Sequence, residues 1–290
     1  GLIPAGGGTR RLEICNPMPE TNDTIDVYRT SAASADGRVV YNLFRARSTV
    51  HTPQLSSTLE LAPLSHPLQA EVLQGIPYTL PTGQMHTGAT HLSWLNDTRL
   101  VYVGSEIFYI RTPPGTIGTA PDTLTAGRDI VLMDLTGSGA VLTAVPNTDL
   151  ASSVAPGADG NSVYYTVLGD SQVYRRDLGT GTSSVIHDFG AGTIVRDVDV
   201  VGTTLVAIVG GIIEFFTVAT LGPVQPDEGG MLTTVDLATG TETVLDADTT
   251  VVYRRPAISP DGSRVVVERY QTFSGTAVDR RADLYLFPLP

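Results

Sequence analysis

A short turn motif followed at once by an apolar run recurs along the chain, and it constrains the fold more than any other feature. The fullest copy is Ser259-Pro260-Asp261-Gly262 before the run RVVV. Partial copies precede four other apolar runs. The equivalent positions of the five copies are Asp36, Asn96, Asp159, Val201 and Asp261, which are 60, 63, 42 and 60 residues apart. A repeat of this length predicts a fold built from similar structural units.

A second motif alternates with the first. A strand ending in Asp-Leu, a turn containing glycine and another strand occur together at 131–145, 173–186 and 232–245. This pattern is typical of a β-hairpin. Each repeat therefore predicts four strands, of which the second is nearly continuous in apolar residues, as in strands covered on both faces. Four-stranded sheets repeated around an axis form a β-propeller.

The two ends of the chain complement each other in this arrangement. Residues 282–290 have the pattern of a third strand with no fourth strand after it, and residues 9–15 that of a fourth strand alone. Pairing the two would close the ring and remove an open sheet edge. We predict an all-β fold, a single propeller of five four-stranded blades over 9–290 after a flexible linker at 1–8. The alternative is six blades, with an irregular one hidden in 205–230.

The blade bounds expected from the two motifs are 24–77, 87–148, 150–190, 193–248 and 251–290.

The repeat also carries a resemblance to a known family. Residues 254–267, RRPAISPDGSRVVV, resemble the repeat of TolB-type propellers, relatives of the WD-repeat proteins. Ser34, Asp36 and Gly37 match that turn with alanine in place of proline, whereas Asp159 and Gly160 match only its last two positions. The resemblance implies protein binding, often in the bacterial periplasm. The chain departs from TolB in its five expected blades and in having no room for TolB's separate N-terminal domain.

Composition narrows the class of function. The net charge of −12 disfavours a nucleic-acid surface, because such surfaces need clustered basic residues. The single cysteine, Cys15, excludes a disulfide framework, and no apolar run approaches the ~20 residues that span a bilayer. All 18 basic residues are arginine, which indicates a GC-rich bacterial genome. Because the chain begins at Gly1, we expect that an upstream segment was removed, which is a signal peptide, a membrane anchor or simply disordered residues. Together with the many Thr, Gly and Asp residues and the absence of lysine, this favours an exported, periplasmic or cell-surface protein.

Three aspartates are candidates for catalysis. The strands nearest the axis would carry Asp26, Asp197 and Asp199, and the last two, being two residues apart, would share a face. A glycosidase needs two carboxyl groups across the scissile bond. The alternative is that these acids are solvated or pair with Arg254 and Arg255 of the next blade. The five histidines are scattered and no Gly-x-Ser-x-Gly motif occurs, so we expect no metal, no cofactor and no serine-hydrolase chemistry.

Long connections after the apolar strands are the candidates for binding. Those at 111–129, 211–230 and 271–283 would emerge on one face, and long loops on a rigid scaffold commonly carry binding. Residues 212–218 could instead continue an apolar strand into the core. The expected partner contacts are aromatic, aliphatic and arginine side chains: Arg111, Ile213, Phe215, Phe216, Arg280 and Arg281.

These observations favour one function and leave two alternatives. The leading hypothesis is a non-catalytic exported scaffold that binds another protein, as an accessory subunit of a larger periplasmic or membrane-attached assembly. The first alternative is a glycosidase that uses the axial carboxylates. The second is a propeller that binds a sugar or another small ligand.

Overall fold

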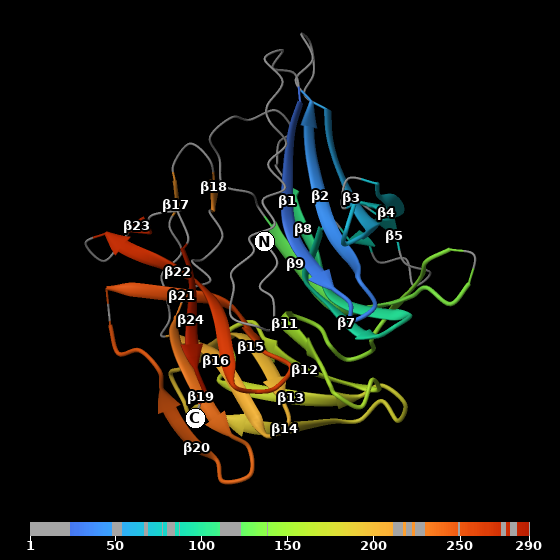
Figure 1. The fold of residues 1–290 in the computed structure, drawn as a ribbon. Helices are drawn as coiled ribbons and strands as arrows, with labels where there is room; N and C mark the ends of the chain where they lie inside the picture. The colour runs from blue at the N-terminus through green and yellow to red at the C-terminus, as the bar shows by residue number, and fades with distance from the viewer. Residues whose placement is uncertain are drawn as a thin grey trace.

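The computed structural model describes residues 24–47, 54–66, 69–76, 78–79, 85–86, 88–110, 123–137, 139–210, 217–218, 222–223, 230–248, 250–273, 277–278 and 283–289. These residues form five antiparallel sheets of four strands, arranged as a five-bladed β-propeller (Figure 1). The all-β, five-bladed prediction is confirmed. Within the described residues no helix is long and apolar enough to cross a membrane.

In the first four blades the strands follow one another across the sheet in chain order. Blade 1 contains β1 (Thr24–Ala33), β2 (Arg38–Arg47), β3 (Gln54–Pro63) and β4 (Glu71–Ile76). Blade 2 contains β7 (Gly88–Asn96), β8 (Arg99–Ile110), β9 (Thr123–Asp134) and β10 (Val141–Ala144). Blade 3 contains β11 (Ala151–Pro156), β12 (Ser162–Val167), β13 (Gln172–Asp177) and β14 (Ser183–Asp188).

The last two blades include short additional pairs. Blade 4 contains β15 (Ile194–Val201), β16 (Thr204–Gly210), β19 (Met231–Asp236) and β20 (Thr241–Val244). Blade 5 contains β21 (Val251–Ile258), β22 (Arg264–Phe273), β23 (Ala277–Val278) and β24 (Asp283–Pro288). Two small hairpins lie outside the blades: β5 (Tyr78–Thr79) with β6 (Met85–His86), and β17 (Thr217–Val218) with β18 (Gly222–Pro223).

The apolar second strands are explained by the cores between blades. In β16, Leu205, Ala207 and Val209 pack towards blade 3, whereas Val206 and Ile208 pack towards blade 5. All five side chains are buried. A strand that packs on both faces gains from apolar residues at every position, because each face removes apolar surface from water.

The Ser-x-Asp-Gly motif forms the turn between the first and second strands. Gly262 has φ +71°, which only glycine adopts without steric cost. Ser259 Oγ donates to Asp261 Oδ1 at 2.6 Å and accepts from the backbone N–H of Arg264 at 3.0 Å. The hydrogen bond from the Ser259 hydroxyl, and after it those from the backbone N–H and hydroxyl of Ser263, lower the pKa of Asp261 to about 2. The motif therefore satisfies the polar groups of a tight turn and starts the apolar strand.

The last strand, β24, pairs with β22, the second strand of blade 5. It therefore takes the third-strand position predicted for residues 282–290. Among the described strands none pairs with the other edge of β24, where Leu284 and Leu286 are 53% and 50% exposed. The predicted closing strand at 9–15 and the linker at 1–8 lie outside the described residues.

Candidate functional site

The first strands of the blades surround the axis of the propeller. β7 packs against β1 and β11, and β15 packs against β11 and β21. Each of the five strands has a register shift where it pairs with the second strand of its own blade. Such β-bulges redirect side chains and are common beside functional sites. The bulged positions are Arg29, His91–Leu92, Ser152, Arg196 and Arg255–Pro256.

Asp197 joins three blades at this level. Its Oδ2 lies 3.3 Å from His91 Nε2 of blade 2 and accepts the backbone N–H of Arg255 of blade 5 at 3.0 Å. Its Oδ1 accepts the backbone N–H of Val198 at 2.9 Å. Only 6% of Asp197 is exposed. A buried carboxylate with several donors is stable only where its partners are fixed, so Asp197 ties these blades together.

Asp199, two residues after Asp197, also connects blade 4 to blade 5. Its Oδ2 accepts the backbone N–H of Ile258 at 2.7 Å, and its Oδ1 that of Val200 at 2.9 Å. Burial raises the pKa of Asp199 to about 6, and the charge on Asp197 acts in the same direction, against the two hydrogen bonds. We define the axial cluster as His91, Asp197, Asp199 and Arg255.

The structure gives Asp197 and Asp199 hydrogen-bond partners in the neighbouring blade. Asp197 and Asp199 accept backbone donors of blade 5, so the expected pairing with Arg255 occurs through its backbone N–H rather than its guanidinium. Asp26 lies in β1 opposite Arg45, and its side chain is outside what the structure describes.

Two residues of the axial cluster have strained backbones. His91 has φ +54° and Arg255 has φ +48°, in the left-handed region that residues other than glycine and asparagine rarely adopt. Such a conformation costs roughly 1–2 kcal/mol per residue. Both residues contact the same oxygen of Asp197, which holds them in place. The Arg255 guanidinium also donates to Glu268 Oε1 at 3.0 Å and is 46% exposed.

His91 was not among the site residues predicted from the sequence, where it was one of five scattered histidines. Within the described residues, no group of three or more His, Cys, Asp or Glu side chains could hold a metal ion.

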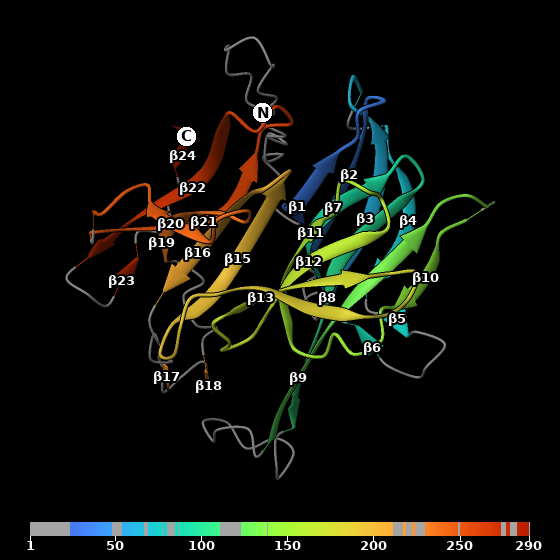
Figure 2. The same cartoon turned by 90° about the horizontal axis from the view of Figure 1, so that it is seen from below.

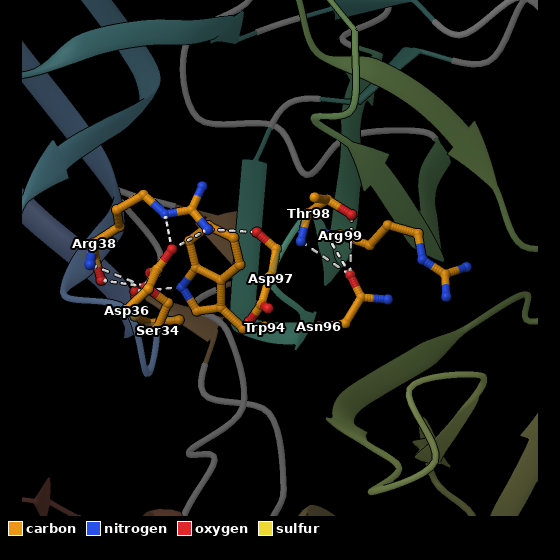
Figure 3. A network of polar contacts seen from close by, with 9 residues as sticks. Ser34, Asp36, Arg38, Trp94, Asn96, Asp97, Thr98 and Arg99 are labelled. Atoms are coloured by element: carbon orange, nitrogen blue, oxygen red, sulfur yellow. Dashed lines mark hydrogen bonds and ion pairs between the residues drawn. The ribbon is translucent and has the colours of Figure 1, made fainter.

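Arginines bind neighbouring turns at the end of the propeller that carries the Asp-Gly turns. Arg38 donates to the carbonyl of Asp97 in blade 2, and Arg99 donates to the carbonyl of Gly160 in blade 3 at 2.7 Å. Trp94 Nε1 donates to the carbonyl of Ala32 at 3.0 Å, and the Arg38 guanidinium lies 4.8 Å from the Trp94 ring centroid (Figure 3). The structure therefore gives the single tryptophan a role in holding blades 1 and 2 together.

A two-stranded hairpin extends from blade 2 on the opposite face. β8 pairs with β9 along its whole length, from Arg99 opposite Asp134 to Ile110 opposite Thr123. β7 pairs with β8 only as far as Ser105, and β10 pairs with β9 only as far as Val131. We call residues 106–110 and 123–127 the arm, because among the described strands they pair only with each other. Figure 2 shows β9 extending away from the blades.

The other two long connections also contain hairpins. β17 pairs with β18 between β16 and β19, and β23 pairs with the end of β22. Figure 2 shows β17 and β18 in the lower half of the view, as it does the end of β9. The predicted connection at 111–129 is too long, because β9 begins at Thr123.

The predicted partner contacts in these connections lie outside the described residues: Arg111, Ile213, Phe215, Phe216, Arg280 and Arg281.

Comparison with known proteins supports the fold. No protein-family model matches the chain, and no curated protein matches its sequence. A TolB protein from Agrobacterium tumefaciens has 13% identity and a TM-score of 0.55, over 91% of this chain and 78% of that chain. A gluconolactonase from Xanthomonas campestris has 13% identity and a TM-score of 0.53, over 91% of this chain and 72% of that chain.

A third solved structure, an oligogalacturonate lyase in complex with manganese, has 15% identity and a TM-score of 0.48. The match covers 91% of this chain but only 65% of the length of the lyase. At these identities the likeness shows the fold alone. The TolB resemblance is therefore supported as a resemblance of propeller architecture.

Proposed function

We propose that this propeller is a scaffold that binds another protein, with the arm of blade 2 as the main contact. The observation that carries the proposal is the pairing of the arm. A two-stranded hairpin is marginally stable alone, and both of its outer edges present backbone N–H and C=O groups that no described strand pairs. A partner that adds a strand to such an edge satisfies these groups.

The sequence of the arm also favours contact with a protein. Ile107, Phe108 and Tyr109 occupy consecutive paired positions in β8, opposite Ala126, Thr125 and Leu124 of β9. β-Branched and aromatic residues favour extended strands, and aromatic residues are enriched at protein interfaces. The hairpins in the connections of blades 4 and 5 would extend this surface.

The glycosidase alternative has less support. A general acid must release its proton to the leaving group, and a nucleophile or base must reach the substrate. Asp197 and Asp199 instead accept backbone N–H groups of blade 5, and Asp197 is buried whereas Asp199 is half-buried.

As part of the same proposal, we place the scaffold outside the cytoplasm, in the periplasm or at the cell surface, as an accessory subunit of a larger assembly. The lysine-free composition and the propeller likeness to a TolB protein support this placement.

The experiment replaces residues 106–127 with Asn-Gly, the preferred two-residue hairpin turn, between the paired residues Ser105 and Arg128. The control is Val185→Ser, which changes an exposed residue on the outer strand of blade 3. Affinity purification from the native source should recover a stoichiometric protein with the wild type and the control and lose it with the shortened variant. Retention of that partner by a folded shortened variant would exclude the arm, and the absence of a partner for every form would contradict the scaffold itself.

A further inference from the structure

Blade 3 presents two leucines beside the base of the arm. Leu150 is 43% exposed and Leu168 is 41% exposed. The two residues are neighbours, because the backbone N–H of Leu168 donates to the carbonyl of Leu150 at 2.9 Å. Neither leucine belongs to the core cluster that blades 2 and 3 share. The packing of the propeller therefore leaves a large part of each apolar side chain in contact with solvent.

The backbone of Leu150 is strained. Its φ is +62°, in the left-handed region, where a bulky residue is an outlier and glycine or asparagine fits with less strain. The bond to Leu168, and that from the N–H of Ala151 to the carbonyl of Thr148 at 3.1 Å, use only backbone atoms. Asparagine could therefore make both. Such outliers cluster at functional sites. A leucine at this position costs stability that core packing does not restore.

The loop before Leu150 is fixed to β9 near the base of the arm. Thr148 is buried, and its hydroxyl accepts the backbone N–H of Ile130 at 3.1 Å and donates to the carbonyl of Val145 at 2.7 Å. Ile130 lies three residues beyond Gly127, the last arm residue of β9, and three residues of a strand span about 10 Å. The surface that carries the exposed leucines therefore adjoins the arm.

The same contacts show which edge of the arm is nearer to the leucines. The N–H of Val145 donates to the carbonyl of Ile130 at 2.8 Å, so both backbone groups of Ile130 point to the β10 side. In a regular strand every second residue points its backbone groups the same way. Those of Arg128 and Ala126 therefore face that side too, where no described strand pairs with them. A strand added there would continue the line of β10 and reach the loop of Leu150.

The surroundings of the two leucines are acidic. Asp149 precedes Leu150 and is exposed, and Asp170 lies in the turn after Leu168 and is half-buried. The chain as a whole has a net charge of −12. Interfaces pair opposite charges around their apolar contacts. A partner segment with an apolar side chain beside a basic one therefore matches this surface.

We propose that the partner of the arm also docks on Leu150 and Leu168, through a segment that adds to the outer edge of β9 and carries an apolar side chain beside a lysine or arginine. This inference rests on the proposed function and makes it more specific, because it names the edge of the arm, an apolar contact at its base and the charge of the partner segment. Leu150 is the anchor of the contact, and Asp149 attracts the basic residue.

The test measures the affinity of variants of the whole chain for the protein recovered with the wild type in the experiment above, once that protein is purified. Leu150→Asn removes the apolar anchor and introduces a residue that tolerates positive φ, and Asp149→Asn removes one charge. The matched control is Val141→Ser, because Val141 is 61% exposed in β10 but lies at the opposite end of blade 2. The variant that lacks residues 106–127 is measured beside them, and the melting temperature of each is recorded.

We expect Leu150→Asn to weaken binding by about tenfold or more, because the burial of a leucine side chain in the interface is lost. The same variant should raise the melting temperature, because its backbone is less strained. Asp149→Asn should weaken binding, with a loss that shrinks at high salt, and Val141→Ser should leave binding unchanged.

The inference is overturned if Leu150→Asn binds as the wild type does or lowers the melting temperature. If the variant without the arm alone loses binding, the proposed function still stands. Unchanged binding by Asp149→Asn would exclude the basic partner segment. Loss of binding by Leu150→Asn but not by the variant without the arm would contradict both proposals, as would the absence of a partner for every form.

Discussion

Replacing Asp199 with asparagine would make the stability of the propeller less dependent on pH. Burial raises the pKa of Asp199 to about 6, whereas an aspartate in an unfolded chain titrates near about 3.9. The folded protein therefore holds this proton more tightly than the unfolded chain does. The resulting stabilisation is fully present below the unfolded pKa and is lost as the pH rises through about 6.

The magnitude follows from these two values. Between pH 4.5 and pH 7 the linkage relation gives a loss of about 2 kcal/mol in the free energy of unfolding. Asn at this position does not titrate, and it keeps only one acceptor oxygen for the N–H groups of Val200 and Ile258. The variant therefore pays a separate cost of about 1–3 kcal/mol that does not change with pH.

The assay is urea unfolding of the wild type and Asp199→Asn at several pH values from 4.5 to 7.5. The difference in free energy of unfolding should be largest at pH 4.5 and fall by about 2 kcal/mol by pH 7. Carboxyls with lowered pKa, such as Asp159 and Asp261, titrate below this window in the folded protein and cancel in the difference. A difference that stays constant or grows with pH would refute the argument.

Three further variants test other parts of the structure. Gly262→Ala should lower the free energy of unfolding by about 1 kcal/mol because of its φ of +71° alone, since the nearest atom to an added Cβ is Val201 Cγ1 at 4.0 Å. Urea unfolding measures this loss. Gly262→Asn is the matched control, and it should lower the free energy of unfolding by less, because asparagine tolerates positive φ. Arg99→Met removes the bond to the carbonyl of Gly160 and should cost about 1 kcal/mol, with faster amide exchange in the turn of blade 3; unchanged exchange would argue against the contact. Tyr253→Phe should remove one step of phenolate absorbance at high pH, because burial and the bond to Asp246 raise the pKa of Tyr253 to about 12; an unchanged titration curve would contradict this.

The repeat was predictable because its physical causes are local. A strand packed between two blades needs apolar residues at consecutive positions, as Leu205 to Val209 show. The turn before it needs a glycine and short polar side chains, as Ser259 and Asp261 show. Both requirements leave a direct trace in the sequence, so the number and order of the strands followed.

The axial cluster left no such trace. In a regular strand, side chains alternate between two faces, and this rule placed Asp197 and Asp199 together but gave His91 no partner. The bulge at His91 breaks the alternation, and its contact with Asp197 joins residues from different blades. The outer part of β9 was missed for another reason. Residues 123–127 contain threonines and a glycine, a composition typical of a loop. They form a strand because they pair with β8.

Hydrogen–deuterium exchange on the isolated protein and on the purified complex tests the central claim most directly. In β8, residues 99–104 lie between β7 and β9, whereas residues 106–110 pair with β9 alone. We predict slow exchange for the first group in both samples, and fast exchange for the second that becomes slow in the complex. Arm amides that exchange equally fast in both samples, with protection gained elsewhere, would contradict a scaffold that binds its partner through the arm.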